Sequence, residues 1–423
     1  MLQLQVLRNQ KDLVLAGLKK KNFASLDLVE SILKLDEDRR KMLSENEAHL
    51  AIINALSKEI GKLMASGEKE EAEKKKAEVA TSKEASKQIS ETLALLEKQQ
   101  HDALVQLPNL PADIVPVGKT PGENITVRSG NVIPELYADA VPHWDLCTKY
   151  NLIDFELGTK ITGSGFPVYI HKGARLQRAL INYFLDFNTQ AGYTEFQVPL
   201  MVNSDSAYGT GQLPDKEGQM YHATVDDFYM IPTAEVPLTN IYRDVIVKEN
   251  ELPIKLTGYT PCFRREAGSY GKDVRGLNRL HQFDKIEVVQ FSVPEKSYQV
   301  LDEMVLHVEK LLQSMNMPYR ILRLCGGDMS FASALTYDFE VFSAAQKRWL
   351  EVSSVSNFET FQTNRMKIRY KTEEGKMQLL HSLNGSSLAL PRIVACLLEN
   401  NQTAEGIRIP DVLIPYMGMD MIS

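Results

Sequence analysis

The first quarter of the chain carries apolar side chains at a seven-residue repeat, which is typical of coiled coils. One apolar seam runs through residues 28–63 and a second through residues 79–107. Between them, Gly67 can adopt the left-handed conformation that ends a helix and reverses the chain. We therefore predict two antiparallel helices of about 40 residues, each about 60 Å long. Arg39, Asn46 and His49 fall in the first seam, so its packing should be thin there.

The pattern changes abruptly at residue 108. No proline precedes Pro108, whereas Pro108, Pro111, Pro116, Pro121 and Pro134 follow within a short stretch. Because proline disrupts regular backbone hydrogen bonding, this stretch is expected to be a stiff linker. The predicted organisation is a helical coiled-coil arm over residues 1–107, a linker over residues 108–134 and a larger domain over residues 135–423.

The larger domain mixes helical and strand-like patterns. Helices are predicted over residues 173–191 and 295–314. Strands are predicted at Tyr193–Pro199, Leu256–Glu266, Phe283–Val293, Thr336–Phe342 and Trp349–Ser354. Several strands follow one another without helices between them, which favours an antiparallel sheet flanked by helices. The predicted fold class is therefore α+β, with a two-helix arm before the sheet domain.

The composition indicates a protein without a membrane span. No stretch of about 18 uncharged apolar residues is present. The first 21 residues lack the apolar core and cleavage site of a secretory signal, so we expect a cytoplasmic location. The cysteines are far apart and form no CxxC pair, so buried reduced thiols are expected rather than disulfides or zinc. They are Cys147, Cys262, Cys325 and Cys396.

The formal net charge of −7 does not by itself indicate a nucleic-acid partner. Basic residues are nevertheless clustered in the arm, at Arg39–Lys41 and Lys74–Lys76. Such clusters are more often solvated helical faces with ion pairs within the helix. The alternative is a surface that follows the phosphates of an RNA.

Two arginines are candidates for binding phosphate, because a rigid guanidinium matches phosphate oxygens. Arg264 and Glu266 are two residues apart in a predicted strand, which would put both on one face of a sheet. Arg392 follows a strand and turn and would lie in the first turns of a helix. Taken alone, an arginine and a glutamate spaced like Arg264 and Glu266 more often form a surface ion pair. An arginine placed like Arg392 is more often an ordinary residue on a helix surface. Neither glycine-rich nucleotide-binding loop is present in the sequence, so ATP would have to be held in another way.

These residues belong to segments that resemble seryl-tRNA synthetases of the bacterial type, a class II family. Thr257–Gln290 resembles motif 2 and Asn384–Arg392 resembles motif 3. Four further segments are also similar: Gly209–Pro214, Pro232–Thr239, Glu351–Asn357 and Ile409–Gly418. The resemblance covers essentially the whole chain. It implies a class II catalytic domain that activates L-serine with ATP and Mg²⁺, without zinc. It also implies transfer to tRNA(Ser) and, where it exists, to tRNA(Sec), in protein biosynthesis.

The resemblance also implies an ATP-binding set of residues. Arg264 would bind the α-phosphate and the substrate carboxylate, and Glu266 would contact the adenine end. Phe283 and Arg392 would cover the two faces of adenine, and Glu351 and Ser354 would hold Mg²⁺. The set consists of Arg264, Glu266, Leu280, Phe283, Glu351, Val352, Ser353, Ser354 and Arg392, of which Arg264, Glu266 and Arg392 would be catalytic.

A serine pocket follows from the same resemblance. Thr233 and Glu235 would bind the ammonium group, Arg264 the carboxylate, and Glu287 and Ser386 the hydroxyl. A site built to hydrogen-bond a hydroxyl rejects alanine, because its buried groups would be left unpaired. For Glu287, the alternative is a salt bridge at the edge of a strand. The adjacent Ser387 leaves the choice between the two serines open.

The resemblance further implies a homodimer and an RNA-binding loop. Arg178–Gly192 and Tyr193–Pro199 would form the motif 1 dimer contact. The arm of one subunit would bind a tRNA whose acceptor end enters the other subunit. The basic, glycine-containing loop Ala267–Arg279 would meet ATP and then the acceptor end.

Several positions depart from the family pattern. Leu335 stands where a lysine is common, Phe342 replaces a tryptophan, Ser343–Ala345 replaces a Leu-Pro pair, and Asp215 replaces a lysine. Two alternative functions are a non-catalytic relative that binds RNA or regulates, and a ligase that loads an amino acid onto a carrier protein. Ligases of the latter kind lack the arm and use cysteine-bound zinc.

Overall fold

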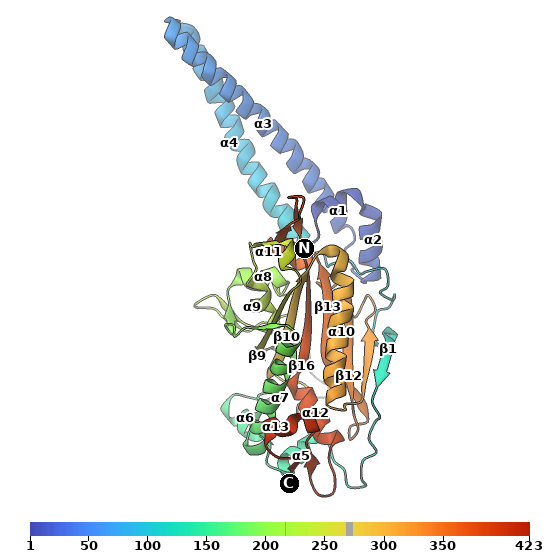
Figure 1. Cartoon of the computed structure of the whole chain (residues 1–423). Coiled ribbons are helices and arrows are strands. Elements are labelled where there is room, and N and C mark those ends of the chain that lie inside the picture. Colours follow the sequence, from blue (N-terminus) through green and yellow to red (C-terminus); the bar gives the residue numbers. More distant parts are fainter. Residues whose placement is uncertain (216, 268–273) are drawn as a thin grey trace. The chain divides into compact units, whose positions relative to one another are not determined.

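The computed structural model describes residues 1–215, 217–267 and 274–423, which form two compact units (Figure 1). The arm unit comprises residues 2–19 and 23–108. The sheet unit comprises residues 109–423 together with Met1 and residues 20–22.

Two long helices form most of the arm unit, as the heptad pattern predicts. Helix α3 spans Leu28–Ser66 and α4 spans Lys69–Leu104, and they run side by side in opposite directions (Figure 1). Gly67 ends α3 with a φ of 85°. Among the predicted seam positions, Ile32, Leu56 and Val79 are buried, and most of the others are half-buried. Two short helices that were not predicted, α1 (Leu4–Asn9) and α2 (Lys11–Lys20), precede the pair.

One buried charge holds the base of the arm unit together. The carboxylate of Asp36 accepts two hydrogen bonds of 2.6 Å from Arg8, one from each of two guanidinium nitrogens. Arg40 donates to it at 3.1 Å and Gln100 at 3.3 Å. Burial opposes ionisation, but the hydrogen bonds from Arg8 and Gln100 lower the pKa of Asp36 below its usual value. These contacts join α1, α3 and α4 at one point.

The sheet unit is built on an eight-stranded sheet of the described residues, in the order β1-β11-β12-β13-β16-β10-β9-β4. Neighbouring strands are antiparallel except for β4 and β9, which confirms the predicted α+β class. The strands are β1 (Ile125–Gly130), β4 (Thr194–Glu195), β9 (Ile254–Phe263), β10 (Gln282–Ser292), β11 (Tyr319–Arg323), β12 (Leu335–Ser343), β13 (Arg348–Glu359) and β16 (His381–Ala389).

Helices cover one face of this sheet (Figure 1). They are α7 (His171–Gln190), α10 (Ser297–Ser314) and α12 (Leu390–Asn400). Phe184, Val288 and Leu397 lie in the main core between these helices and the sheet. A second core contains Val289 and Phe291, and it is shared with α9 (Glu235–Asn240) and α11 (Phe361–Met366). Because successive strand residues face opposite sides, β10 contributes to both cores.

The remaining elements of the sheet unit are short. The helices are α5 (His143–Lys149), α6 (Phe155–Ile161), α8 (Ser204–Thr210) and α13 (Ile414–Met417). The strands form small separate sheets: β2 (Ile153–Asp154) with β3 (Val168–Tyr169); β5 (Met201–Val202), β6 (His222–Ala223) and β7 (Phe228–Met230); β8 (Ile246–Lys248), β14 (Arg369–Lys371) and β15 (Met377–Leu379); β17 (Ile407–Arg408) with β18 (Met421–Ile422).

Several predicted boundaries differ from the structure: the strand predicted at Trp349–Ser354, for example, continues to Glu359 as β13. Only Thr194–Glu195 of the predicted strand Tyr193–Pro199 is a strand, and β9 ends at Phe263 rather than at Glu266. The proline-rich stretch expected to be a linker contains β1, which pairs with β11 at the edge of the sheet. No proline lies between Pro121 and Pro134, so the backbone donors needed for this pairing are present.

All four cysteines are buried, as expected. None of the helices in the described part of the chain combines the length and apolar character that crossing a lipid bilayer requires.

Replacing Asp36 by Asn should destabilise the arm unit by about 2–3 kcal/mol, because a buried ion pair with Arg8 is lost. The measurement is the urea unfolding midpoint of the full chain, followed by circular dichroism at 222 nm. Asp38, which is paired with Lys34 on the helix surface, provides the matched control, Asp38→Asn. Equal midpoints for the two variants would contradict the role given to Asp36.

Candidate active site

Two buried glutamates lie at the centre of the candidate site. Glu287 comes from the middle of β10, and Glu235 is the first residue of α9. Both are nearly inaccessible to solvent. The side-chain amide of Asn384, on β16, donates to Glu235 Oε2 at 2.9 Å and to Glu287 Oε1 at 3.0 Å. One amide therefore holds both carboxylates.

Positive charge beside this pair comes from Lys285 and Arg264. Lys285 Nζ lies 2.7 Å from Glu287 Oε2, and the Thr233 hydroxyl donates to the same oxygen at 3.3 Å. Burial raises the pKa of Glu287, although Lys285 opposes this shift. Burial and the neighbouring Glu287 raise the pKa of Glu235 to about 7. An additional cation, such as a ligand ammonium group, would be attracted to this pair.

Gln362 and Asn384 belong to this site but were missed from the sequence. Gln362, on α11, donates to Glu235 Oε1 at 2.6 Å, and Ser382 donates to Gln362 Oε1 at 2.7 Å. A lone amide residue carries no sequence signal of such a role. For Lys285, its two-residue spacing from Glu287 along a strand is a signal that could have been used.

The two neighbouring serines of β16 face opposite sides of the sheet. Ser387 is fully buried and donates to Asn188 Oδ1, on α7, at 2.8 Å. Ser386 is paired with Glu287 in the β10–β16 ladder and lies two residues from Asn384. Because residues two apart share a face, Ser386 is on the side of the glutamate pair. Of the two serines, Ser386 is therefore the one on the same side of the sheet as the glutamates.

Arg264 lies just beyond the end of β9, next to the buried pair. Its Nε donates to the carbonyl of Pro232 at 3.3 Å, and its guanidinium lies 5.2 Å from the centre of the Phe283 ring. Glu266 does not share a strand face with it, because β9 has ended and Glu266 has a φ of 51°. Glu266 instead forms an ion pair with Arg279.

Arg392 approaches the same region from the third position of α12. Its Nε donates to the carbonyl of Asn278 at 3.2 Å, and a terminal nitrogen donates to the carbonyl of Glu351 at 2.7 Å. The backbone N–H of Arg264 donates to the carbonyl of His281 at 2.9 Å, and His281 Nδ1 lies 3.1 Å from the carbonyl oxygen of Arg264. The two arginines, 128 positions apart in the chain, thus contact one short segment, residues 278–283.

An acidic group lies on the neighbouring strands β12 and β13. Asp338 is paired with Ser354 across these strands, and the Ser354 hydroxyl is hydrogen-bonded to it. Burial and the nearby Glu351 raise the pKa of Asp338 well above its usual value. Its Oδ1 has no hydrogen-bond partner among the described residues. Hard oxygen donors with an unsatisfied carboxylate fit a divalent cation such as Mg²⁺.

The other predicted members of the set lie around these groups. Val352 and Leu280 are buried, and Ser353 donates to the carbonyl of Ser386 at 2.6 Å. That hydrogen bond joins β13 to β16 beside the glutamate pair. In the predicted loop, Gly268, Gly271 and Lys272 lie outside the described residues.

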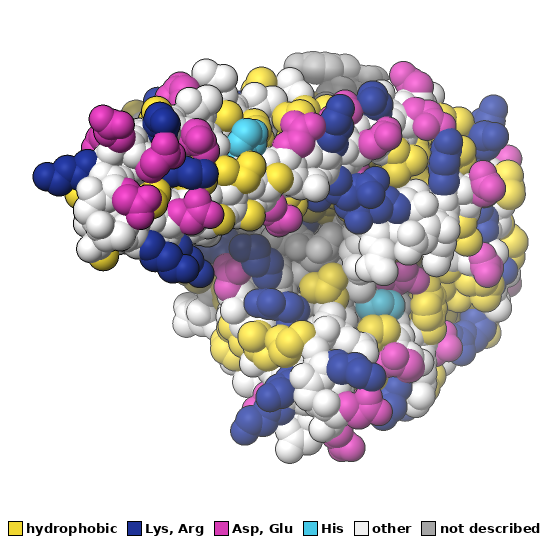
Figure 2. Space-filling view, turned by 90° about the horizontal axis from the view of Figure 1, so that it is seen from above, with side chains coloured by type: hydrophobic (Ala, Val, Ile, Leu, Met, Phe, Trp, Pro, Cys, Tyr) yellow, Lys and Arg dark blue, Asp and Glu magenta, His cyan; other side chains and the backbone are white. Residues whose placement is uncertain are grey.

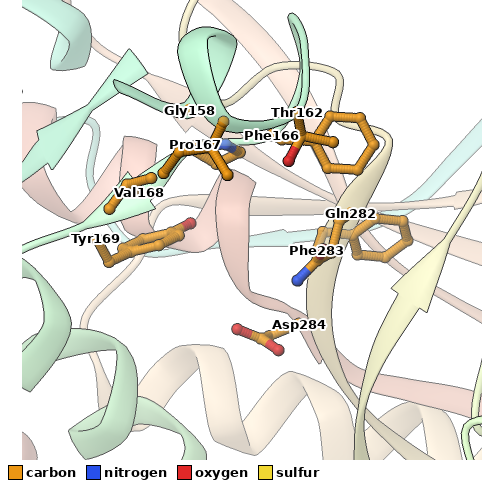
Figure 3. Close-up of a pocket in the computed structure, with 10 residues that line it drawn as sticks. Gly158, Thr162, Phe166, Pro167, Val168, Tyr169, Gln282, Phe283 and Asp284 are labelled. Atoms are coloured by element: carbon orange, nitrogen blue, oxygen red, sulfur yellow. The ribbon is translucent and has the colours of Figure 1, made fainter. Parts of the chain in front are cut away.

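A cavity of about 220 Å³ adjoins the start of β10 (Figure 3). Phe283 and Asp284 line it from β10, and Phe166 and Tyr169 line it from the segment that contains β3. Asp284 accepts hydrogen bonds from Tyr259 at 2.9 Å and from Gln177 at 2.7 Å. The Phe283 ring therefore borders an open space as well as the guanidinium of Arg264.

Three departures from the family pattern have local structural roles. Asp215 accepts hydrogen bonds from the backbone N–H groups of Gln219 and Met220, at 3.0 and 2.8 Å. The Phe342 ring packs edge-on against Trp349. Leu335 is buried in the main core. None of these contacts involves the glutamate pair or the two arginines.

Two family models match separate parts of this chain. The seryl-tRNA synthetase N-terminal domain family matches residues 1–111, and the class II tRNA synthetase core domain family (G, H, P, S and T) matches residues 220–401. A serine-tRNA ligase from Salinibacter ruber is 50% identical over 100% of this chain and 99% of its own length.

Solved structures extend the similarity to three dimensions. Seryl-tRNA synthetase from Pyrococcus horikoshii, complexed with ATP, has a TM-score of 0.94 at 31% identity and covers 100% of this chain and 99% of its own. The cytoplasmic serine-tRNA ligase from Naegleria fowleri, in complex with AMP, has a TM-score of 0.89 at 28% identity, with the same coverage.

A ligand with a primary ammonium group, such as free serine, should bind more weakly as the pH falls below about 7. Glu235 must be ionised to pair with an ammonium group, so the Kd should rise by up to about tenfold per pH unit below its pKa. Binding near pH 7 should also release protons. Isothermal titration in buffers of different ionisation enthalpy measures both effects.

The matched variant for this titration is Glu235→Gln, which cannot titrate and should bind weakly at every pH. A serine Kd that stays constant between about pH 6 and 8, with no proton release, would contradict the raised pKa of Glu235.

Proposed function

Because this chain belongs to the seryl-tRNA synthetase family and is a serine-tRNA ligase, we propose that the residues around Glu235 and Glu287 select serine and that Arg264 and Arg392 activate it with ATP. The observation that carries the proposal is the buried pair of carboxylates held by Asn384. Such a pair is costly to bury unless cations and hydrogen-bond donors compensate it, and an amino-acid ligand supplies both.

In this proposal, each end of serine has its own partner. Glu235 and Thr233 bind the ammonium group, Glu287 and Ser386 bind the hydroxyl, and Arg264 binds the carboxylate. The pairing of Glu287 with Ser386 across β10 and β16 supports a hydroxyl position between them. Alanine would leave Glu287 without this partner, which disfavours it strongly.

The first reaction step is an attack of a serine carboxylate oxygen on the α-phosphorus of ATP. A new P–O bond forms to give seryl-adenylate, the bond to the β-phosphate oxygen breaks, and pyrophosphate leaves. Arg264 would stabilise the negative charge on the α-phosphate, with Arg392 at the γ-phosphate and one face of adenine. Positioning and charge stabilisation carry this kind of chemistry, so no side chain acts as a base.

The base of ATP would lie against Phe283, with Glu266 and the backbone of Leu280 at its edge. Contact of both arginines with residues 278–283 supports a common nucleotide site there. Glu351 and Ser354, with Val352 and Ser353 between them on β13, would hold Mg²⁺ and phosphate oxygens. Asp338 adds a further carboxylate at that position. A bound Mg²⁺ would neutralise charge on the phosphates.

In the second step, a hydroxyl of the terminal tRNA ribose attacks the seryl carbonyl and AMP leaves. The arm unit is proposed to bind the tRNA, and its match to the family's N-terminal domain supports this role. Basic and acidic side chains are interspersed over the surface drawn in Figure 2. Lys74 and Lys76, for example, are paired with Glu71 and Glu73. RNA phosphates would have to compete for these lysines. Charging of tRNA(Sec) is proposed for cells that contain it.

A homodimer is also proposed, as the family resemblance implies. Its contact would be made by the motif 1 segments, Arg178–Gly192 and Tyr193–Pro199. They contain most of α7 and the strand β4, which lies at an edge of the main sheet. A cytoplasmic location is proposed because the relative from Naegleria fowleri is described as cytoplasmic.

Serine should support exchange of pyrophosphate into ATP, whereas alanine should be poorer by about 10⁴-fold in kcat/KM. Replacing Glu287 by Gln should lower kcat/KM for serine by about 100-fold, because the serine hydroxyl loses a charged partner. The assay compares serine, threonine, alanine and glycine. The exposed Glu295 provides a control of the same chemistry, Glu295→Gln. Equal exchange with serine and alanine would exclude the proposed pocket.

Replacing Lys74, Lys75 and Lys76 together by Ala should raise the KM for tRNA by about tenfold and weaken its salt dependence. Pyrophosphate exchange, which involves no RNA, is the internal control. A variant with three dispersed lysines of α4 replaced, Lys83, Lys87 and Lys98, tests for a general effect of charge. The same KM in both triple variants would argue against a specific role for the cluster.

A further inference from the structure

A buried histidine connects the nucleotide-side segment to α12. His143 is the first residue of α5, and neither its side chain nor that of Glu399 on α12 is exposed. His143 Nδ1 lies 2.7 Å from Glu399 Oε1, and the backbone N–H of Leu277 donates to Nε2 at 2.9 Å. Since Nε2 accepts a hydrogen bond, the proton must be on Nδ1 and point to Glu399. These two partners therefore fix the orientation of the His143 ring.

Glu399 is itself held in place from several sides. It accepts hydrogen bonds from the Ser343 hydroxyl, from the Gln346 amide at 2.9 Å and from the His143 backbone N–H at 3.0 Å. Burial opposes ionisation, but the hydrogen bonds from His143 and Ser343 lower the pKa of Glu399. Ser343 is one of the departures from the family pattern. The carboxylate therefore orients the imidazole without depending on solvent.

The segment of residues 275–280, which His143 contacts, packs against the start of α5. Gly276 has a φ of 65°, and a Cβ atom there would lie 2.2 Å from His143 Nε2. The Arg275 guanidinium lies 4.6 Å from the centre of the Trp144 ring, which is the next residue of α5. Leu277 is buried. Three consecutive residues thus pack against the first turn of α5.

The next three residues of this segment contact the proposed ATP-binding set or belong to it. The carbonyl of Asn278 accepts a hydrogen bond from Arg392, and Arg279 forms an ion pair with Glu266. Leu280 is itself a member of the set. A shift of the backbone at Leu277 would therefore disturb the contacts of this segment with both Arg392 and Glu266.

We propose that His143, oriented by Glu399, is a positioning residue for ATP activation, because its Nε2 fixes the Leu277 N–H and thereby the contacts of residues 278–280 with Arg392 and Glu266. This inference rests on the nucleotide site proposed above. His143 touches neither substrate there and acts only through the segment.

Two substitutions separate this role from simple packing. In His143→Gln, the side-chain oxygen can reach the Nε2 position and accept the Leu277 N–H, but the donor to Glu399 is lost. In His143→Asn, the amide can still donate to Glu399, but no acceptor reaches Leu277. Both remove the ring and both are smaller and polar. His381→Asn, at a buried histidine bonded to Ser297, is the matched control.

The readouts are pyrophosphate exchange, serine affinity and hydrogen exchange of the Leu277 amide, measured on full-length proteins whose thermal unfolding is recorded in parallel. His143→Asn should raise the KM for ATP and lower kcat, together by about 10- to 100-fold, while serine affinity is retained. Its Leu277 amide should lose protection. His143→Gln should retain most of the activity and most of the protection.

Equal activity and equal protection of Leu277 in the Asn and Gln variants would overturn the proposal and leave His143 as a packing residue. The amide measurement does not depend on catalysis, so it tests the contact even if a variant is inactive. Failure of the wild-type protein to exchange pyrophosphate with serine would instead refute the proposed function.

Discussion

The site depends on keeping two carboxylates ionisable inside a folded sheet. Glu235 and Glu287 are both buried and share one amide donor, Asn384. Two like charges in such a place repel each other and lose hydration, so the fold must supply cations and donors nearby. Lys285 and Arg264 supply the charge, and Thr233 and Gln362 supply further hydrogen bonds. The pKa of Glu235 stays raised to about 7 despite these groups, so the ammonium group of a ligand would stabilise the ionised form of Glu235.

The order of the strands makes this arrangement possible. Because β16 lies between β10 and β13, Glu287, Ser386 and the Glu351–Ser354 stretch come from three adjacent strands. The two-residue alternation then separates Ser386, on the side of the glutamates, from Ser387, which is bonded to Asn188 on α7. The same alternation lets β10 supply both the main core, through Val288, and the polar site. Specificity and folding therefore depend on the same register between β10 and β16.

The sequence was sufficient for the elements with a clear period or a well-marked motif. The heptad predicts α3 and α4, and the strand-like runs predict the antiparallel sheet, because both signals are local. The predicted end of β9 at Glu266 was wrong, because the strand ends at Phe263. Glu266 has a positive φ, which a polar residue at the end of an apolar run does not reveal. Asp36 and Asn384 were missed for another reason: their partners, Arg8 and Glu235, are distant in sequence. Nothing near such residues along the chain marks them as buried.

The proposed roles differ with the place of each residue in its helix or strand. Glu287 and Ser386, which would bind the serine hydroxyl, lie in the interior of β10 and β16. Groups that would handle phosphate lie where elements end, as Arg264 does after β9 and Arg392 at the start of α12. Residues in the middle of a strand are held by hydrogen bonds on both sides, whereas those at its ends need separate anchors. The carbonyls of Pro232 and Asn278 provide such anchors, and the second of them lies next to the backbone amide bound by His143. This arrangement suits a site that must recognise one hydroxyl and also accept a triphosphate. The hydroxyl side is held by the sheet itself, whereas the two arginines on the phosphate side are held by contacts outside the sheet.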